Sequence, residues 1–347
     1  IITGLSKGSL VEVTARSSTA AYKGQSPDIR EVAAKLGASY VLEGSVRRAG
    51  SRARITAQLV DAANGNHVWG DRFDRPMNDI FEMQDEIAHH LGSLMTELVW
   101  QDIARKTATL APGDYGPFDH FIIGVDALHH LSPAGTSTAE RHFQAALKQS
   151  PDLAYVHGAI GLAYLAGWML WGDPERDVIE IARHHAVRAR DLAPNDPLTY
   201  RLHGRLATVT RAFEEIKRHA DRARRLDPNN ADLIMAAALN DLFAGDIGNS
   251  RRLLENVLEV HSDTAHLAEI TRMWMSLTQF VMGDPTSAKA TAGEISGLDF
   301  MKNLLLAACH AALGEDVAAR VRATALLVEV PGFSVSRFGF LKCFRDP

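Results

Sequence analysis

The feature that most constrains this chain is a set of prolines that recur at a fixed distance behind predicted helices. Pro194 and Pro228 lie 34 residues apart, and Pro151 lies 43 residues before Pro194, which is one such period plus an insertion of nine residues. A proline ends a helix because it lacks a backbone N–H and crowds the turn before it. The spacing therefore predicts successive helical units of nearly constant length.

Small side chains keep the same distance from these prolines. Positions five before, twelve before and ten after them are almost all Ala or Gly: Ala146, Ala189 and Ala223; Ala139, Ala182 and Ile216; Gly161, Gly204 and Ala238. Closely packed antiparallel helices need small residues at fixed positions, because large side chains would separate their backbones. This pattern resembles the tetratricopeptide repeat, a helix–turn–helix unit of about 34 residues. Weaker marks at Val260 and Pro331 extend the period, so we expect five to six repeats over residues 118–333.

The insertion of nine residues falls within residues 166–175, where Trp168 and Trp171 lie. It is expected to lengthen the first helix of its repeat and the loop that follows. One interpretation is that the two tryptophans cap the core at an oversized turn. The other is that they form an aromatic contact for a partner or a neighbouring domain.

Residues 1–78 follow a different pattern. A β-type run covers residues 10–14, and Asp28 with Glu31 forms a capping-box signal for a helix that Gly37 ends. Strands are expected at residues 40–48, 54–61 and 67–73, and Asn64-Gly65 is a two-residue hairpin signal. The fold class predicted for the whole chain is a small α+β domain followed by an all-α superhelix, predominantly α overall.

A second capping box at Asp79 opens a long amphipathic helix over residues 79–110. Its apolar side chains from Ile80 to Leu98 form a seam that must be buried on the sheet or against another chain, so a homodimer through this helix is one expectation. Residues 111–117 contain two prolines and two glycines and are the predicted linker. Residues 334–347 are expected to be a truncated tail, and the start at Ile1 suggests a piece of a longer protein.

Six motifs in roughly the first 100 residues carry a second resemblance. They are TARSST at 14–19, DIREVAAKLG at 28–37, YVLEGSVRR at 40–48, RITAQLVD at 54–61, WGDRFD at 69–74 and DIFEMQDEI at 79–87. Together they are similar to the TolB N-terminal-like domain that precedes tetratricopeptide repeats in bacterial signalling proteins. In that family the pair often follows a class III adenylate/guanylate cyclase catalytic domain, or sometimes a winged-helix DNA-binding domain. The family's module usually begins with one more strand and a helix start ahead of Ile1.

No pattern typical of catalysis or metal binding occurs in the sequence. It has no GxxxxGK[ST] loop, GxSxG elbow or HExxH helix, and no constellation of the kind a class III cyclase needs. Histidine pairs at 89–90, 129–130 and 184–185 are adjacent, and adjacent side chains on a helix point about 100° apart, so they cannot share a metal ion. The only cysteines, Cys309 and Cys343, form no CxxC motif. We therefore expect no catalytic residue, cofactor or metal in this chain.

Charge and hydropathy restrict the partners. The net charge of -5 gives no reason to expect direct nucleic-acid binding, although arginines crowd the first predicted hairpin at positions 47, 48, 52 and 54. No aromatic platform is interleaved with them, so a solvated hairpin or a charge-protected edge is the preferred interpretation. No apolar run reaches the roughly 18–20 residues that span a bilayer. A cytoplasmic protein is expected.

The candidate binding residues lie in the best-marked repeat. Arg201 and Arg205 are four residues apart, on one helix face around Gly204. Repeat arrays usually bind along the concave face formed by their first helices, where the two arginines could clamp carboxylates of a protein or peptide. The alternative is that they pair with neighbouring acids such as Asp232.

The sequence thus predicts a non-catalytic regulatory and protein-interaction region of a bacterial signalling protein. The resemblance to the TolB-like and repeat pair places it in the C-terminal part of an adenylate/guanylate cyclase. Two alternatives remain open: the sensor region of a winged-helix transcriptional regulator, and a free-standing tetratricopeptide scaffold.

Overall fold

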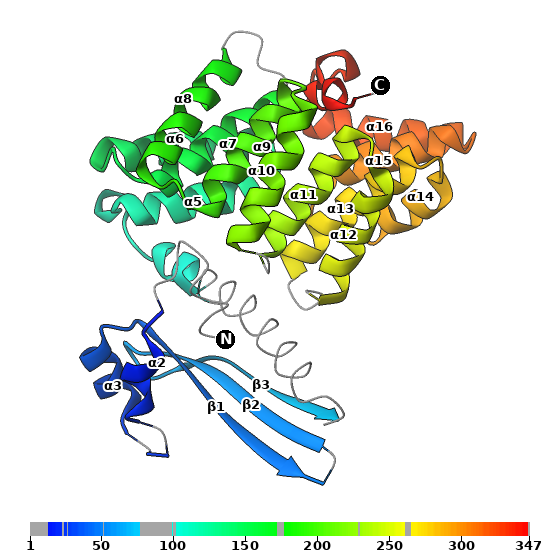
Figure 1. Ribbon diagram of the computed structural model, residues 1–347. Coiled ribbons are helices and arrows are strands. Elements are labelled where there is room, and N and C mark those ends of the chain that lie inside the picture. The colour runs from blue at the N-terminus through cyan, green and yellow to red at the C-terminus, as the bar shows by residue number, and fades with distance from the viewer. Residues whose placement is uncertain are drawn as a thin grey trace. The chain divides into compact units, whose positions relative to one another are not determined.

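A computed structural model of the 347-residue chain describes residues 13–22, 24–25, 27–50, 52–76, 99, 102–171, 177–227, 230–260 and 265–345. The chain divides into two compact units, Ile1–Lys106 and Thr107–Pro347. Figure 1 shows a small sheet with short helices in the first unit and an array of helices in the second. The predicted fold class is confirmed: the chain is predominantly α-helical, with a small α+β part ahead of the helical array.

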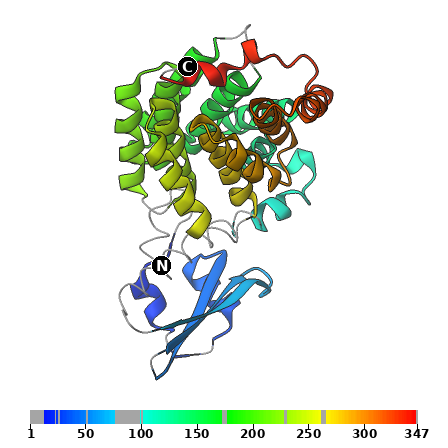
Figure 2. The ribbon, with the colours of Figure 1, turned by 90° about the vertical axis from the view of Figure 1, so that its right-hand side faces the viewer.

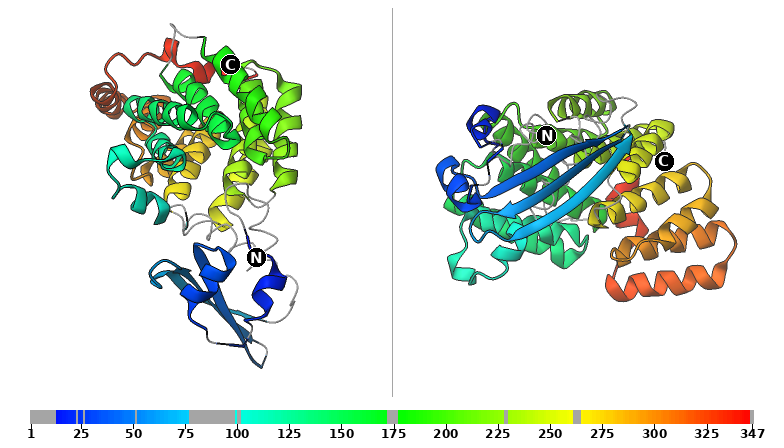
Figure 3. Two further views of the ribbon diagram at one scale, coloured as in Figure 1. Left: turned by 90° about the vertical axis from the view of Figure 1, so that its left-hand side faces the viewer. Right: turned by 90° about the horizontal axis from the view of Figure 1, so that it is seen from below.

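The sheet of the first unit is an antiparallel meander of three strands, in the order β1-β2-β3. The strands are β1 (Tyr40–Ala49), β2 (Arg52–Asp61) and β3 (His67–Pro76), close to the predicted bounds. Ala53, Ala57 and Leu59 of β2 are buried while Arg54 and Thr56 are exposed, so the strand alternates as far as Leu59, after which Val60 and Asp61 are buried as well. Figure 3 shows the three strands side by side.

Two short helices precede the sheet. α3 (Ile29–Leu36) starts where predicted, because the Asp28 carboxylate accepts the Arg30 backbone N–H at 2.9 Å, and it ends at Gly37 with a φ of 65°. α2 (Arg16–Ala20) was not predicted. Of the expected strand at residues 10–14, residues 10–12 lie outside the described residues, and 13 and 14 form no strand.

The loop between β2 and β3 is longer than the predicted two-residue turn and covers residues 62–66. Its shape follows from Asp61, whose carboxylate accepts the Ala63 backbone N–H at 2.9 Å and the Asn64 side-chain amide at 2.8 Å. Gly65 still supplies the left-handed conformation, with a φ of 75°. The asparagine and glycine mark the turn, but the aspartate sets its length.

A partly buried ionic cluster ties the helical residues 102–106 to the sheet within the first unit. The Lys106 ammonium lies 2.9 Å from Asp61 and 2.7 Å from Asp102, and the Tyr40 hydroxyl donates to Asp102 at 2.8 Å. Burial alone would raise the pKa of Asp102, but hydrogen bonds from Lys106, Tyr40 and Arg105 offset it and hold that pKa at about 2. The predicted seam from Ile80 to Leu98, and the homodimer expected from it, lie outside the described residues.

The second unit is built from consecutive helix pairs. Each helix packs on the next, and the first helix of each pair also contacts the first helix of the following pair, from α5 to α15. That is the packing of a tetratricopeptide-type array. Among the described residues there are six pairs: α5 (Pro117–His129) with α6 (Pro133–Gln149), α7 (Ala154–Leu170) with α8 (Val178–Leu192), α9 (Pro197–Val209) with α10 (Phe213–Leu226), α11 (Ala231–Ala244) with α12 (Ile247–Val260), α13 (Ala265–Val281) with α14 (Pro285–Gly293), and α15 (Asp299–Ala312) with α16 (Asp316–Glu329).

The small residues of the repeat lie where helices approach most closely. The alanines five residues before the prolines are almost wholly buried, and a Cβ added at Gly161 would lie 2.6 Å from a methyl carbon of Leu202. A Cβ on Gly204 would lie 3.1 Å from the Asn240 amide. Close contact between successive first helices therefore explains why glycine occupies this phase.

Within the described residues, no further helix pair follows α16. Residues 330–345, here called the return segment, instead turn back through two 3-10 turns, η2 (Val335–Arg337) and η3 (Gly339–Cys343). Figure 2 shows this red segment crossing from α16 towards the green helices, and η3 contacts both α7 and α9. Phe340 and Cys343 are almost fully buried, so the segment is part of the core of the array.

Candidate binding face of the repeat array

The candidate site is the surface formed by the first helices α7, α9, α11, α13 and α15, here called the first-helix face. Several of these helices contribute a large aromatic ring to it, and the rings of Phe243 and Phe300 are almost fully buried. One hydrophobic cluster joins these helices to the return segment, and its members include Trp168, Trp171, Phe243, Trp274, Phe300, Phe338 and Phe340.

Arg201 and Arg205 lie on α9 and are both half-buried. Among the described residues neither has a carboxylate at ion-pair distance. The Arg201 Nε has no hydrogen-bond partner there, and the one hydrogen bond of the Arg205 guanidinium among these residues is to the Met169 sulfur, at 3.9 Å. Burial, with a contribution from the Arg201 charge, lowers the pKa of Arg205 to about 10. The predicted pairing with Asp232 is not among the contacts of the described residues.

Two half-buried arginines without an acid are costly, because a desolvated charge is stable only when it is paired or hydrogen-bonded. Their planar guanidinium groups match carboxylates and phosphates in geometry. The arrangement therefore offers a place for an anionic group that the chain itself does not supply in the described residues.

Trp168 and Trp171 lie at the end of α7, and both contact later parts of the same chain. A Cβ on Gly339 would lie 2.7 Å from the Trp168 carbonyl oxygen, so the return segment approaches this residue at backbone distance. The Trp171 ring packs edge-on against Phe300 of α15 at 4.6 Å, and its indole N–H donates to Thr136 at 3.3 Å. The return segment therefore covers part of Trp168, which keeps intermediate exposure.

Rings of the return segment contact different helices in turn. Phe340 stacks on Trp274 of α13 with centroids 5.5 Å apart and meets Phe243 of α11 edge-on at 4.8 Å. Phe344 also packs on Phe243, at 5.1 Å, and Phe333 packs on Phe300 of α15 at 5.3 Å. The return segment thus covers part of the face on which the arginines and tryptophans lie.

Three cross-helix histidine pairs were not anticipated. In each of the first three repeats, a histidine of the first helix faces one of the second helix: His120 with His142, His157 with His185, and His203 with His219. The two Nδ1 atoms are 3.0 Å apart in the first pair and 2.8 Å apart in the second. A sequence signal did exist, because the second-helix members each lie nine residues before a repeat proline.

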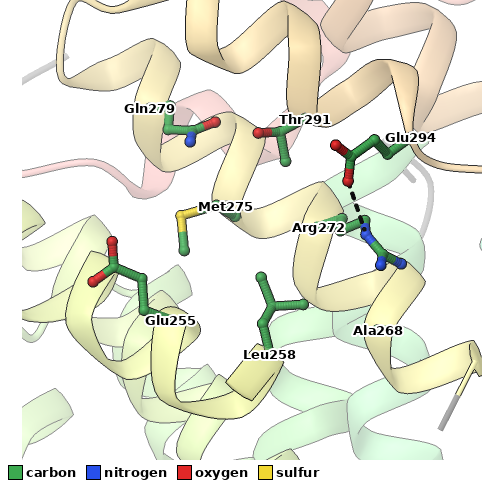
Figure 4. A pocket seen from close by; sticks show the side chains of 8 residues that line it. All are labelled: Glu255, Leu258, Ala268, Arg272, Met275, Gln279, Thr291 and Glu294. Atoms are coloured by element: carbon green, nitrogen blue, oxygen red, sulfur yellow. Dashed lines mark ion pairs between the residues drawn. The ribbon is translucent and has the colours of Figure 1, made fainter. Parts of the chain in front are cut away.

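A cavity of about 320 Å³ lies between α12, α13 and α14. Figure 4 shows Arg272 pointing towards Glu294, which lies 3.4 Å away, and Met275 and Gln279 on the later turns of α13. Arg272 is also within 3.9 Å of Glu269, so its charge is already neutralised by two acids. The cavity therefore offers no strong charge to a ligand.

No group of three or more His, Cys, Asp or Glu side chains is arranged to hold a metal ion in the described part of the chain. Over the same residues, no helix has both the length and the apolar character that crossing a membrane requires. Cys309 and Cys343 are both buried free thiols.

Comparison with protein-family models gives no match. A curated relative from Rhizobium meliloti (strain 1021), named "Putative adenylate cyclase 3", is 34% identical over 198 residues, which is 57% of this chain and 34% of the relative. The chain thus spans about a third of the length of the curated relative that it matches.

Two solved structures resemble the fold at low sequence identity. PilF of Pseudomonas aeruginosa is 14% identical, with a TM-score of 0.39 over 65% of this chain and 96% of its own. A thermophilic TPR protein of Thermus thermophilus is 18% identical, with a TM-score of 0.41 over 61% of this chain and 99% of its own. The repeat architecture described here rests on the helix pairing and spacing of this chain itself.

Proposed function

We propose that this chain is a non-catalytic, protein-binding regulatory region of a bacterial signalling protein, which acts in the cytoplasm behind an adenylate/guanylate cyclase catalytic domain. Residues 1–78 would be the TolB N-terminal-like domain, residues 79–110 a connecting helix, residues 111–117 a linker and residues 118–333 the interaction array. The relative named as a cyclase supports this parent, since it is about three times as long as the segment it shares with this chain.

The observation that carries the binding proposal is the arginine pair on the first-helix face. Arg201 and Arg205 are half-buried and lack an acid among the described residues. Because their guanidinium groups have already lost part of their hydration, a carboxylate of the partner would form a charge-assisted hydrogen bond with them at little further cost to α9. Trp168 and Trp171, close to the same face, would supply aromatic contacts. The partner would be a protein or peptide, and no bound cofactor is needed.

Reversing both charges tests this proposal. In the full chain, Arg201→Glu with Arg205→Glu is expected to weaken capture of the native partner at least about a hundredfold, because two attractive contacts become repulsive. Affinity is measured by titration with the partner isolated on the unmodified chain. The matched control is Arg218→Glu with Arg222→Glu on α10, which has the same spacing and charge change. Retention of the partner by the first variant would contradict the assignment.

Catalysis by this region is tested separately. Incubation of the chain with ATP and manganese is expected to produce no cyclic AMP, since the sequence lacks the paired aspartates that hold the cyclase metals. A cyclase domain of known activity, assayed alongside, is the positive control. Formation of cyclic AMP by this chain alone would contradict a non-catalytic role.

The two alternative parents differ in what precedes Ile1. A winged-helix domain there would favour the transcriptional regulator, and a start codon shortly before Ile1 would favour the free-standing scaffold. In all three cases the first-helix face remains the proposed binding surface.

A further inference from the structure

The return segment occupies the first-helix face in the manner of a bound peptide. It forms no helix pair with α16, and it places its rings one after another on α15, α13 and α11. Its end is held by backbone hydrogen bonds: the Arg345 N–H donates to the Phe243 carbonyl at 2.9 Å, and the Arg211 guanidinium donates to the Arg345 carbonyl at 2.8 Å. Protein grooves commonly recognise peptides by taking up their apolar side chains while hydrogen bonds hold the peptide backbone.

One glycine permits the closest approach. Gly339 lies against Trp168, where an added Cβ would be 2.7 Å from a backbone oxygen and 2.9 Å from a ring carbon. A backbone oxygen cannot rotate away as a flexible side chain can, so any larger residue at 339 pushes the segment off α7. The return segment therefore fits this face only while residue 339 is glycine, and a larger side chain at this position blocks the fit.

The return segment leaves the charged part of the face unsatisfied. Its Cys343 belongs to η3, which contacts α9, the helix of Arg205, and the Cys343 thiol donates to the Gly339 carbonyl at 3.6 Å. Burial raises the pKa of this thiol to about 11, so the thiol is neutral at physiological pH. The segment thus fills the apolar part of the face and offers Arg205 no negative charge. A segment with the same rings and a carboxylate at the Cys343 position would satisfy both.

We infer that the first-helix face binds an aromatic protein segment that carries a carboxylate, and that the return segment occupies this face as an intramolecular competitor. The inference rests on the proposed function and names the partner's chemistry and its regulation. Partner binding then requires release of residues 330–345, and the partner's advantage over the return segment is its ion pair with Arg205.

The test uses the 347-residue chain and a fluorescent peptide of residues 330–345 in which Cys343 is replaced by Asp. Gly339→Val is expected to free the face, so that the peptide binds this variant at least about tenfold more tightly than the unmodified chain, in which the competitor is covalently attached. Trypsin cleavage after Lys342 is expected to accelerate in parallel. Gly248→Ala is the matched control, because a Cβ there meets nothing within 4 Å.

A second arm isolates the charge. The Cys343→Asp peptide is expected to bind Gly339→Val roughly tenfold more tightly than the near-isosteric Cys343→Asn peptide, as a charge-assisted hydrogen bond predicts. Adding Arg205→Gln to the chain should abolish this difference and leave the binding of the Asn peptide unchanged. An Asp preference that persists without Arg205 would overturn the assignment of the carboxylate.

Other outcomes are equally decisive. Equal peptide binding and equal trypsin cleavage in the Gly339→Val and unmodified chains would show that the segment is no competitor. Should Gly339→Val fail to fold, Phe344→Ala loosens the same segment without a steric clash and is expected to give an intermediate affinity. A dimer in which the segment covers a second copy would overturn the intramolecular assignment. If the peptide binds as expected but the arginine reversal leaves native partners bound, the proposed function fails while the competition stands.

Discussion

Replacing Phe243 with alanine is expected to lower the free energy of unfolding of the repeat array by about 3–5 kcal/mol. The ring is fully buried, and it meets Phe340 at 4.8 Å and Phe344 at 5.1 Å between α11 and the return segment. Removing the ring loses apolar burial and leaves a cavity. Both α11 and the return segment would have to move to fill this cavity. Urea unfolding followed by helical circular dichroism measures the change.

Two further variants serve as references for the stability change of Phe243→Ala. Phe243→Leu retains much of the volume and is expected to cost about 1–2 kcal/mol. Val321→Ala, on a side chain of α16 that is 62% exposed, is expected to change stability by less than about 0.5 kcal/mol. If Phe243→Ala cost no more than Val321→Ala, the ring would not be packed between α11 and the return segment.

The helical array was predictable because its signals are local and repeated. Prolines at 151 and 194 lie just beyond the ends of α6 and α8, and α8, α10 and α12 end at 34-residue intervals, at Leu192, Leu226 and Val260. Each signal acts through its own helix, by ending it or by letting its neighbour approach. The strands were predictable for the same reason, since alternation along β2 depends only on that strand.

The return segment was not predictable from such signals. Its contacts join positions about a hundred residues apart, such as Phe243 with Arg345, and its 3-10 turns have no hydrophobic period that marks a face. The aromatic residues at 333, 338, 340 and 344 are visible in the sequence, but their number does not say which surface they cover. The structure is therefore needed to show that Trp168 and Arg205 lie beside this segment.

The cross-helix histidine pairs were missed for a different reason. The sequence comparison considered only histidines adjacent along one helix, which cannot share a metal ion, and did not consider pairs between two helices. His142, His185 and His219 each lie nine residues before a repeat proline, so they occupy the same position in three successive second helices. The partners His157 and His203 do not share one phase, which is why only the packed structure brings each pair together.

These pairs are expected to make the array sensitive to acid. The His157 Nε2–H donates to the Pro151 carbonyl at 2.9 Å, so in neutral His157 the other ring nitrogen, Nδ1, accepts the Nδ1–H of His185 at 2.8 Å. A further proton on the Nδ1 of His157 would place two N–H groups against each other, and a further proton on the Nε2 of His185 would place a positive charge beside His157. Burial, followed by the charges of His157 and His184, lowers the pKa of His185 to about 4.

The other five paired histidines shift in the same direction. Burial is the largest cause in each case, and it lowers the pKa of His120, His142, His157, His203 and His219. Near His157 and His203, the positive charges of Arg188 and Arg190 act in the same sense. The first three repeats therefore share one response to pH.

The sign of that response follows from proton binding. Because the folded pKa of His185 lies below the unfolded value of 6.5, the unfolded chain binds more protons between these two values. Stability is fully present above about pH 6.5 and is lost as the pH falls towards 4. From about pH 7 to about pH 5, His185 alone is expected to remove about 2 kcal/mol from the free energy of unfolding.

Replacing His185 with glutamine should therefore flatten the pH profile more than it lowers stability. A glutamine amide can still donate to the Nδ1 of His157 but cannot take up a proton, so the loss between about pH 7 and about pH 5 should shrink by about 2 kcal/mol. Denaturant unfolding at each pH measures this, with His130→Gln on an exposed side chain of the same array as the control. A wild-type profile that is flat over this interval, or one that His185→Gln leaves unchanged, would show that the pairs do not govern the response. If His185→Gln instead flattens a sloping wild-type profile, the tight contact between the two helices of these repeats is kept only while their histidines stay neutral.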